Sequence, residues 1–390
     1  MRRVSWALLV LAAACGDNSS RGPDVPDRTS YGEWEMIEPE GAVCGNGSQY
    51  RFFVNYSETS NDVVVALEPG GACWDYESCT GQNGIRGAAN VDGIPEDHTD
   101  FGTRIVPFFQ REYEDNATHD WNLVYVPYCT GDVHTGNAVV EYEDPSGEAD
   151  PITFHHNGHA NMMAVIDWMA GEFQQVPQML VTGCSAGGAG ASINYWFIRQ
   201  GLPGVERAYL LADSGPIFPS GGYSDLLHAK VRESWQVDSI LGDLPPSFDP
   251  EDFGTLNTTL ADAFPDDRLA VTYFRRDYNF SLYSYERFYE DTLPDGGEAD
   301  PDFKEAILDM WWADTQNLVD VFDTRDNLAY FIPYWRALNS SHCSTLISYA
   351  GSDIQEDDAT LEQWVTDLLD DSVPLVSHLE SEQPDEDLPE

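Results

Sequence analysis

One segment constrains the fold more than any other: an apolar run enters a Gly-x-Ser-x-Gly pentapeptide, Gly183–Gly187, and small residues follow it. A serine on a tight turn between a strand and a helix adopts a strained backbone, so its neighbours two positions away need almost no side chain. Gly183 and Gly187 meet that need. The segment therefore predicts a nucleophile elbow with Ser185 at its tip. The backbone N–H of Ala186 would then lie at a helix N-terminus, where it can stabilise an oxyanion.

Strand-like and helix-like patterns alternate along the chain. Apolar runs typical of parallel strands buried on both faces occur at Val63–Leu67, Leu123–Tyr128, Met179–Thr182, Ala208–Ala212 and Leu269–Phe274. Helical patterns cover Ala160–Phe173, Gly190–Arg199, Phe303–Phe322 and Leu361–Leu369. Residues 35–376 contain no Pro/Ser-rich linker and no internal repeat, so we expect one large domain with insertions. Its fold class is α/β and α/β-hydrolase-like, with a central, mostly parallel sheet flanked by helices.

The N-terminus has the form of an export signal. Met-Arg-Arg is followed by the apolar run Trp6–Ala14, which is too short to span a bilayer, and then by Cys15. Ala12–Cys15 is similar to a bacterial lipobox, in which Cys15 is acylated; a plain signal peptide is the alternative. Residues 1–15 are then a lipoprotein signal and residues 16–34 a flexible tether. We expect an outer-membrane or cell-surface lipoprotein, or alternatively a secreted or periplasmic protein, whose only membrane attachment is the lipid.

The charge is extreme. The formal net charge is −49, with 68 acidic residues against 19 lysines and arginines. This balance excludes nucleic acid as a partner. It fits either a heavily solvated acidic surface or adaptation to a saline habitat, where salt screens the self-repulsion. Residues 377–390 are acidic with little to bury, so we expect a disordered tail. We expect a monomer.

A serine nucleophile needs a base and an orienting acid, which follow it in that fold in the order acid, then histidine. Downstream, His378 lies in the acidic tail and His228 in a pattern typical of a surface helix. His342 follows a strand-like stretch and a small polar loop, so it is the expected base. Asp277, after the strand 269–274, is the favoured acid. Asp213 ends an earlier strand and is the competitor, although a turn-capping role explains it without catalysis.

The second half of an oxyanion hole requires a glycine-rich turn after an early strand, because backbone N–H groups must approach the substrate unobstructed. Glu68-Pro-Gly-Gly-Ala follows the strand 63–67. We expect Gly70 and Gly71 to act with Ala186; a simple strand-ending turn is the alternative.

Three blocks carry a family resemblance: residues 67–74 with Cys79, residues 126–136, and residues 183–188. Leu67-Glu-Pro-Gly-Gly-Ala-Cys-Trp74, Val126-Pro-Tyr-Cys-Thr-Gly-Asp-Val-His-Thr-Gly136 and Gly183-Cys-Ser-Ala-Gly-Gly188 occur in this order. Together the blocks resemble the pectin acetylesterase and Notum family of serine carboxylesterases. The resemblance implies a catalytic triad of Ser185, Asp277 and His342. It also implies an oxyanion hole formed by Gly70, Gly71 and Ala186. The two disulfides that it implies are Cys44–Cys129 and Cys73–Cys79.

Six cysteines remain once Cys15 is set aside, an even number that suits disulfides in an exported chain. The close spacing of Cys73 and Cys79 is most simply a local staple. Cys184 precedes the serine and Cys343 follows the histidine, an arrangement similar to that of tannases and some feruloyl esterases, in which a disulfide joins the two loops. We hypothesise a Cys184–Cys343 bridge; two buried unpaired cysteines are the alternative.

A metal site is not expected. There is no C-x-x-C pair, and the histidines at 134, 155, 156 and 159 with Asp132 fit no helical ligand spacing. They are more simply hydrogen-bonded residues near the pocket rim. No cofactor is needed for the expected chemistry.

We therefore expect a serine esterase that removes O-acetyl or other short acyl groups from a polysaccharide such as pectin through an acyl-enzyme. A fatty-acyl deacylase of the Notum type is the alternative, since a polyanionic protein repels pectin unless salt screens it. A non-catalytic carbohydrate-binding lipoprotein is the rival class. Acyl length depends on the insertions between Ser214 and Ser341.

Overall fold

The computed structural model describes residues 25, 28, 30–81, 89–113, 116–349, 352–354, 356 and 359–381. The expected signal peptide and Cys15 lie outside them, so lipid attachment stays a prediction. Within the described part of the chain, no helix is both long and apolar enough to cross a membrane.

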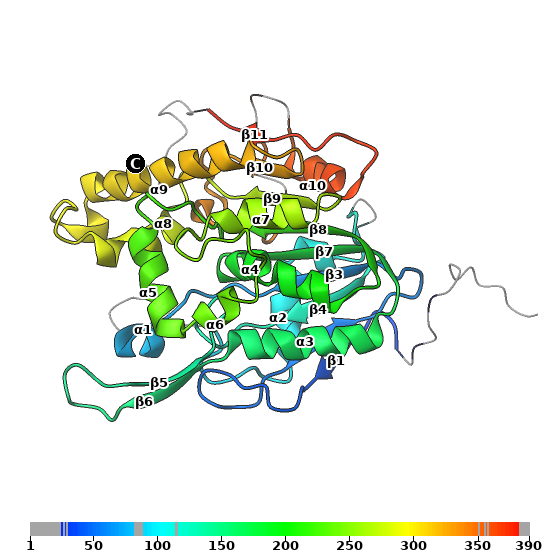
Figure 1. The fold of residues 1–390 in the computed structure, drawn as a ribbon, viewed down its shortest axis with the longest axis horizontal. Helices are drawn as coiled ribbons and strands as arrows, with labels where there is room; N and C mark the ends of the chain where they lie inside the picture. The colour runs from blue at the N-terminus through cyan, green and yellow to red at the C-terminus, as the bar shows by residue number, and fades with distance from the viewer. Residues whose placement is uncertain are drawn as a thin grey trace, which may run out of the picture.

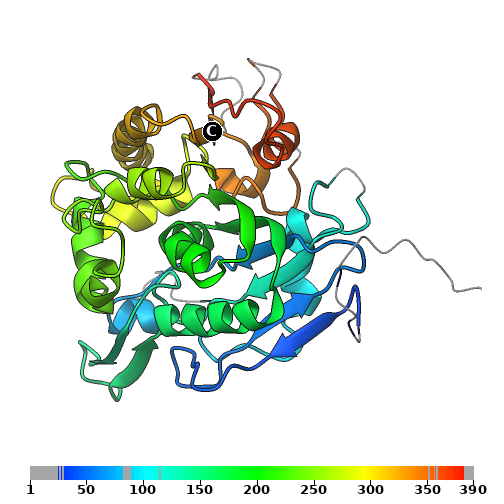
Figure 2. The same cartoon turned by 45° about the vertical axis from the view of Figure 1, so that its right-hand side comes forward.

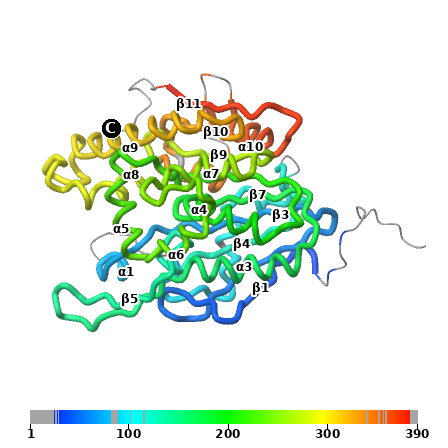
Figure 3. The backbone as a smooth tube through the Cα atoms, in the orientation of Figure 1, coloured from blue at the N-terminus to red at the C-terminus, as the bar shows by residue number. Residues whose placement is uncertain are grey.

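A sheet of nine strands forms the centre of the molecule, in the spatial order β1-β2-β4-β3-β7-β8-β9-β10-β11 (Figure 1). The strands are β1 (Trp34–Ile37), β2 (Phe52–Asn55), β3 (Val63–Leu67), β4 (Asn122–Val126), β7 (Val176–Cys184), β8 (Val205–Asp213), β9 (Arg268–Thr272), β10 (Leu328–Ile332) and β11 (His378–Leu379). β2 pairs antiparallel with both β1 and β4, whereas all the remaining pairs are parallel. β5 (Ala138–Tyr142) and β6 (Ile152–His156) form a separate antiparallel hairpin that projects from the body in Figure 3.

The central strands are buried on both faces, as their near-continuous apolar runs predict. Every residue of β3, β4 and β10 is buried. A strand that needs apolar contacts above and below it must have helices on both sides. The expected strands and helices are all present, and the expected α/β fold class with a mostly parallel sheet is confirmed.

Helices cover the sheet. They are α1 (Tyr76–Thr80), α2 (Thr99–Gly102), α3 (Gly158–Glu172), α4 (Ala186–Gly201), α5 (Asp225–Trp235), α6 (Asp238–Leu241), α7 (Thr255–Ala263), α8 (Tyr278–Tyr285), α9 (Pro301–Phe322) and α10 (Leu361–Leu369). α4 packs on β3, β7 and β8, with α3 and α7 beside it, and Figure 2 shows α3 and α4 in front of the sheet. The helices α5 to α8 are carried by the long connections that follow β8 and β9, where the sequence predicts insertions.

The C-terminal segment differs from the expected disordered tail, because its first residues are ordered. His378 and Leu379 form β11 against β10. Glu380 is 1% exposed, and its carboxylate pairs with the Arg336 guanidinium at 2.9 Å. A buried, paired carboxylate anchors the chain here. The acidic composition of the tail does not predict this ion pair, since the sequence does not show which basic residue lies next to Glu380.

Candidate active site

The elbow is built by glycines. Ser185 lies between β7 and α4 with φ 54° and ψ −121°, an unusual conformation for a residue with a side chain. A Cβ atom on Gly183 would overlap the carbonyl oxygen of Gly187, and one on Gly187 would overlap that of Leu67. The Gly-x-Ser-x-Gly spacing is therefore a packing requirement, because the turn lies against the end of β3. Ala186 begins α4, whose N-terminus faces the same cavity as Ser185.

His342 and Asp277 meet at the same edge of the sheet. Asp277 follows β9 and is fully buried, and its carboxylate oxygens lie 2.8 and 3.1 Å from Nδ1 of His342. It also caps α8 by accepting a hydrogen bond from the Phe280 N–H at 2.9 Å. His342 follows a 3₁₀ turn after β10, and its side chain is 12% exposed. This arrangement leaves Nε2 as the nitrogen that points away from the acid, as a general base requires.

The turn after β3 is held by buried polar contacts. The Glu68 carboxylate accepts hydrogen bonds from the Tyr125 hydroxyl at 2.8 Å and the Tyr128 N–H at 2.7 Å. Nε2 of His134 lies 3.0 Å from the Glu68 carbonyl oxygen. Burial lowers the pKa of His134 to about 4, so its neutral ring can donate there. Gly70 and Gly71, with φ of 150° and 70°, continue the turn and line the cavity with Ser185.

Three disulfides are present among the described residues. Cys44 is bonded to Cys129, Cys73 to Cys79, and Cys184 to Cys343. The last pair bridges 159 positions in sequence and joins the residue before the elbow serine to the residue after the histidine. Disulfides of this kind are consistent with export to an oxidising compartment.

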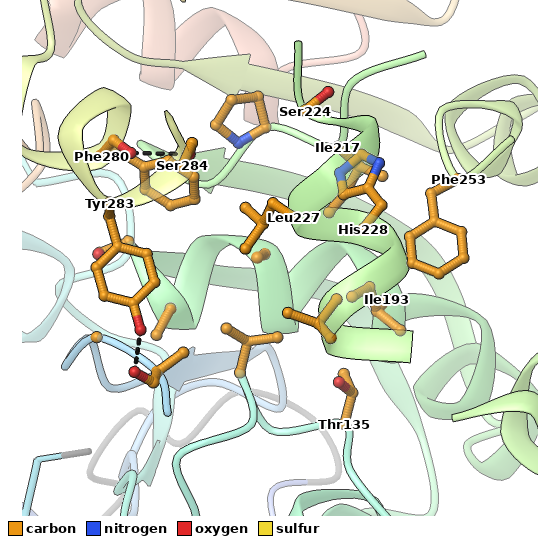
Figure 4. Close-up of a pocket in the computed structure, with 18 of the residues that line it drawn as sticks. Thr135, Ile193, Ile217, Ser224, Leu227, His228, Phe253, Phe280, Tyr283 and Ser284 are labelled. Atoms are coloured by element: carbon orange, nitrogen blue, oxygen red, sulfur yellow. Dashed lines mark hydrogen bonds between the residues drawn. The ribbon is translucent and has the colours of Figure 1, made fainter. Parts of the chain in front are cut away.

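A cavity of about 590 Å³ is lined by Ser185 and His342, and also by Gly70, Gly71 and α4. Figure 4 shows part of its lining. Its walls are mainly apolar and come from α4, α5, α6, α7 and α8 and from the loops between them. The apolar lining includes Ile193, Ile217, Leu227, Val231, Ile240, Leu241, Leu244, Phe248, Leu256 and Phe280. Such a lining fits an apolar ligand.

The structure adds to one expectation at this cavity. His228 lies on α5, a helix with exposed residues as expected, but its ring lines the cavity and packs against Phe253 with ring centres 5.1 Å apart. Burial lowers its pKa to about 4. The aromatic stretch 278–289 serves both as core and as wall, since Tyr285 is buried while Phe280 and Tyr283 line the cavity. An amphipathic helix facing a cavity has the same pattern as one facing the core, so sequence could not separate these cases.

The polar residues of the 132–159 region hold loops together. Asp132 is fully buried and accepts hydrogen bonds from the N–H groups of Gly136 and Gly158 at 3.0 and 2.8 Å. His156 lies 3.0 Å from the Thr130 carbonyl through Nδ1 and 2.8 Å from the Tyr142 hydroxyl through Nε2. Both groups of three candidate metal ligands in the described part of the chain contain a disulfide, whose sulfurs are not thiolates.

The solved structure of the Wnt deacylase Notum from Drosophila has a similar fold. It is 18% identical in sequence, with a TM-score of 0.55 over 85% of this chain and 92% of that one. Among curated proteins, pectin acetylesterase 7 of Arabidopsis thaliana is 29% identical over 200 residues, 49% of this chain and 48% of that protein. Mouse palmitoleoyl-protein carboxylesterase NOTUM is 28% identical over 182 residues, 44% and 33% respectively.

The match thus spans about half the length of the plant relative and a third of the mouse one. Residues 33–238, more than half of the chain, match the family described as Pectinacetylesterase. These residues contain the turn at Gly70 and Gly71 and the elbow, whereas Asp277 and His342 come later in the chain. The chain belongs to the pectinacetylesterase family.

Proposed function

We propose that this chain is a carboxylic ester hydrolase in which Ser185, His342 and Asp277 form the catalytic triad. The observation that carries the proposal is geometric: Ser185 on its strained turn and His342, held by Asp277, line one apolar cavity. Family membership and the esterase names of its relatives support it.

The reaction proceeds in two steps. Ser185 Oγ forms a bond to the ester carbonyl carbon while His342 Nε2 takes the serine proton. The negative oxygen of the tetrahedral intermediate lies toward the backbone N–H groups of Gly70, Gly71 and Ala186. The ester C–O bond then breaks, and the alcohol leaves with the proton from His342. Water, deprotonated by the same imidazole, attacks the acyl-enzyme and releases the carboxylic acid and Ser185.

The cavity favours an acyl group longer than acetyl. A volume of about 590 Å³ is within the range of about 300 to 1,000 Å³ that holds drug-sized ligands, whereas an acetyl group contributes only two carbons. The walls offer apolar side chains from five helices. Binding a longer chain there removes its methylene groups from water, at roughly 0.8 kcal/mol for each. The short acyl group expected from sequence is therefore the second candidate, supported by the pectin acetylesterase relatives.

The net charge bears on the alcohol part of the ester. A chain with a net charge of −49 repels an acidic polysaccharide at low ionic strength. Salt screens this repulsion beyond roughly 10 Å at 0.1 M, and the screening weakens as the salt concentration falls. We infer that a neutral acylated carbohydrate or an acylated protein is a better substrate than acetylated pectin in dilute buffer.

The test is hydrolysis of p-nitrophenyl acetate and p-nitrophenyl octanoate in high salt, with Ser185→Ala alongside. We expect wild-type activity, its loss in the variant, and a higher kcat/KM for octanoate. A preference for acetate would support the deacetylase instead. Folded wild type with no activity on either ester would contradict the esterase and favour the non-catalytic binding protein.

A further inference from the structure

Asp213 contacts both the turn that carries Ser185 and the loop that carries His342. It is the last residue of β8 and is fully buried, directly beside Cys184 in the β7–β8 register. Its backbone carbonyl accepts a hydrogen bond from the N–H of Ser185 at 2.8 Å. The same residue therefore fixes one end of the elbow through its main chain, while its side chain points elsewhere.

The Asp213 carboxylate accepts hydrogen bonds from the loop that carries His342. Oδ1 lies 3.0 Å from both the N–H and the hydroxyl of Ser344. Oδ2 lies 2.6 Å from the N–H of Thr345 and 2.7 Å from its hydroxyl. Ser214 adds a fifth contact, because its hydroxyl donates to Oδ1 at 3.0 Å and accepts from the Cys343 N–H at 2.9 Å. Among the described residues Asp213 has no ion pair, so these donors are its partners.

The loop needs such contacts because its backbone is unusual. Ser340, Ser341 and Cys343 have φ of 52°, 56° and 62°, the left-handed region that residues with side chains rarely adopt. Conformations of this kind are strained and persist only where surrounding structure holds them. None of the three is a glycine. Within the loop, the Ser341 hydroxyl accepts a hydrogen bond from the Arg336 N–H and donates one to the Arg336 carbonyl, both at 2.7 Å. Cys343 is instead held from outside the loop, through its N–H to the Ser214 hydroxyl.

Asp213 is not a second catalytic acid. Both of its oxygens are occupied by loop donors, and Nδ1 of His342 faces Asp277 instead. A turn-capping role is also too local, because the donors lie about 130 positions downstream. Its contacts and the Cys184–Cys343 disulfide join the same two regions, one through hydrogen bonds and the other covalently.

We propose that Asp213 is a positioning residue that holds His342 in place relative to Ser185 by binding Ser344 and Thr345. The proposal rests on the esterase function proposed above. If the proposal is correct, loss of the Asp213 contacts should affect kcat and KM differently. Weakening the contact should misplace the base while leaving the apolar cavity able to bind substrate, so kcat falls and KM does not.

The main test is Asp213→Asn, which keeps the size of the side chain but turns one acceptor into an NH₂ donor facing loop donors. The matched control is Asp267→Asn, a buried carboxylate at the opposite edge of the sheet that pairs with Arg199 at 2.7 Å. For p-nitrophenyl octanoate we expect kcat to fall about 100-fold with KM changed less than about 2-fold, since a 1 Å misplacement costs on the order of 10² in rate. Labelling of Ser185 by a fluorophosphonate should slow in parallel.

Asp267→Asn should lower thermal stability with little change in kcat. Equal kcat losses in the two variants, or an unchanged kcat in Asp213→Asn, would overturn the proposal. If Asp213→Asn does not fold, the double variant Ser344→Ala/Thr345→Val decides, because it removes two hydroxyl donors and keeps the carboxylate. We expect roughly a 10-fold loss of kcat there, and wild-type kcat would overturn the proposal. A wild type that neither hydrolyses the ester nor labels would instead refute the esterase function itself.

Discussion

The elbow and the cavity wall border the same space but are built differently. The elbow is formed by one short segment, residues 176–201, which contains a strand, a turn and a helix. Its shape requires glycines at positions where a Cβ atom would overlap backbone atoms. The wall is assembled from α4 to α8, whose contributing residues are spread from position 186 to position 284. Under the proposed function, the position of the nucleophile would depend on local backbone geometry, whereas acyl preference would depend on tertiary packing.

This difference predicts two kinds of variant. Changes at the reacting end should reduce turnover of every ester alike, because all of them pass through the same tetrahedral intermediate. Changes in the wall should discriminate by acyl length, because only long chains reach it. Three variants test the distinction, and a fourth tests the environment of a histidine in the wall.

The largest effect is expected from Asp277→Asn. The amide cannot stabilise the imidazolium and can select the wrong tautomer of His342, so kcat should fall about 10⁴-fold for acetate and octanoate esters alike. Steady-state kinetics with both esters measures it. A decrease in kcat of less than about 10-fold would contradict the assignment of Asp277 to the triad.

Gly187→Ala should cost about 10² to 10³ in kcat. The added methyl would overlap the Leu67 carbonyl and displace the turn that carries Gly70 and Gly71, disturbing the proposed oxyanion donors. Gly171→Ala in α3 is the control, since a Cβ there meets nothing within 4 Å. Rates measured on both esters should show equal losses for Gly187→Ala. Full activity in that variant would contradict the packing account of the elbow.

Leu227→Trp should narrow the cavity from α5. We expect kcat/KM for the octanoate ester to fall roughly 10-fold or more while that for acetate changes little. Leu226→Trp is the matched control, because the neighbouring side chain is 45% exposed. Equal losses for the two esters in Leu227→Trp would mean that the cavity does not hold the acyl chain.

His228→Phe should produce the smallest effect, visible in stability rather than turnover. Burial lowers the pKa of His228 from 6.5 to about 4, so between these values the unfolded chain binds a proton that the folded chain does not. The free energy of unfolding therefore decreases as pH falls from 6.5 to 4, by at most about 3 kcal/mol from this group. Urea unfolding at pH 7 and pH 4.5 should show a smaller decrease in the variant. An unchanged decrease would contradict a buried neutral ring.

Sequence predicted the elbow side well because its signals are short-range. The five central strands carry long apolar runs, and Gly183 with Gly187 marks the turn directly. The edge strand β1 and its neighbour β2 were not predicted because each is only four residues long, and β11 was not predicted because it has two residues. The cavity wall was not predicted because the sequence of α5 has the pattern of a surface helix. The part played by Asp213 was out of reach too, since its partners are about 130 positions away.

The most direct test of the central claim is covalent labelling of the purified protein with a fluorophosphonate, followed by peptide mass spectrometry. We expect a single adduct on the peptide that contains Ser185, absent in Ser185→Ala and formed much more slowly in His342→Ala, because the probe reports a base-activated serine. No adduct on folded wild type, or an adduct on another residue that persists in Ser185→Ala, would contradict it.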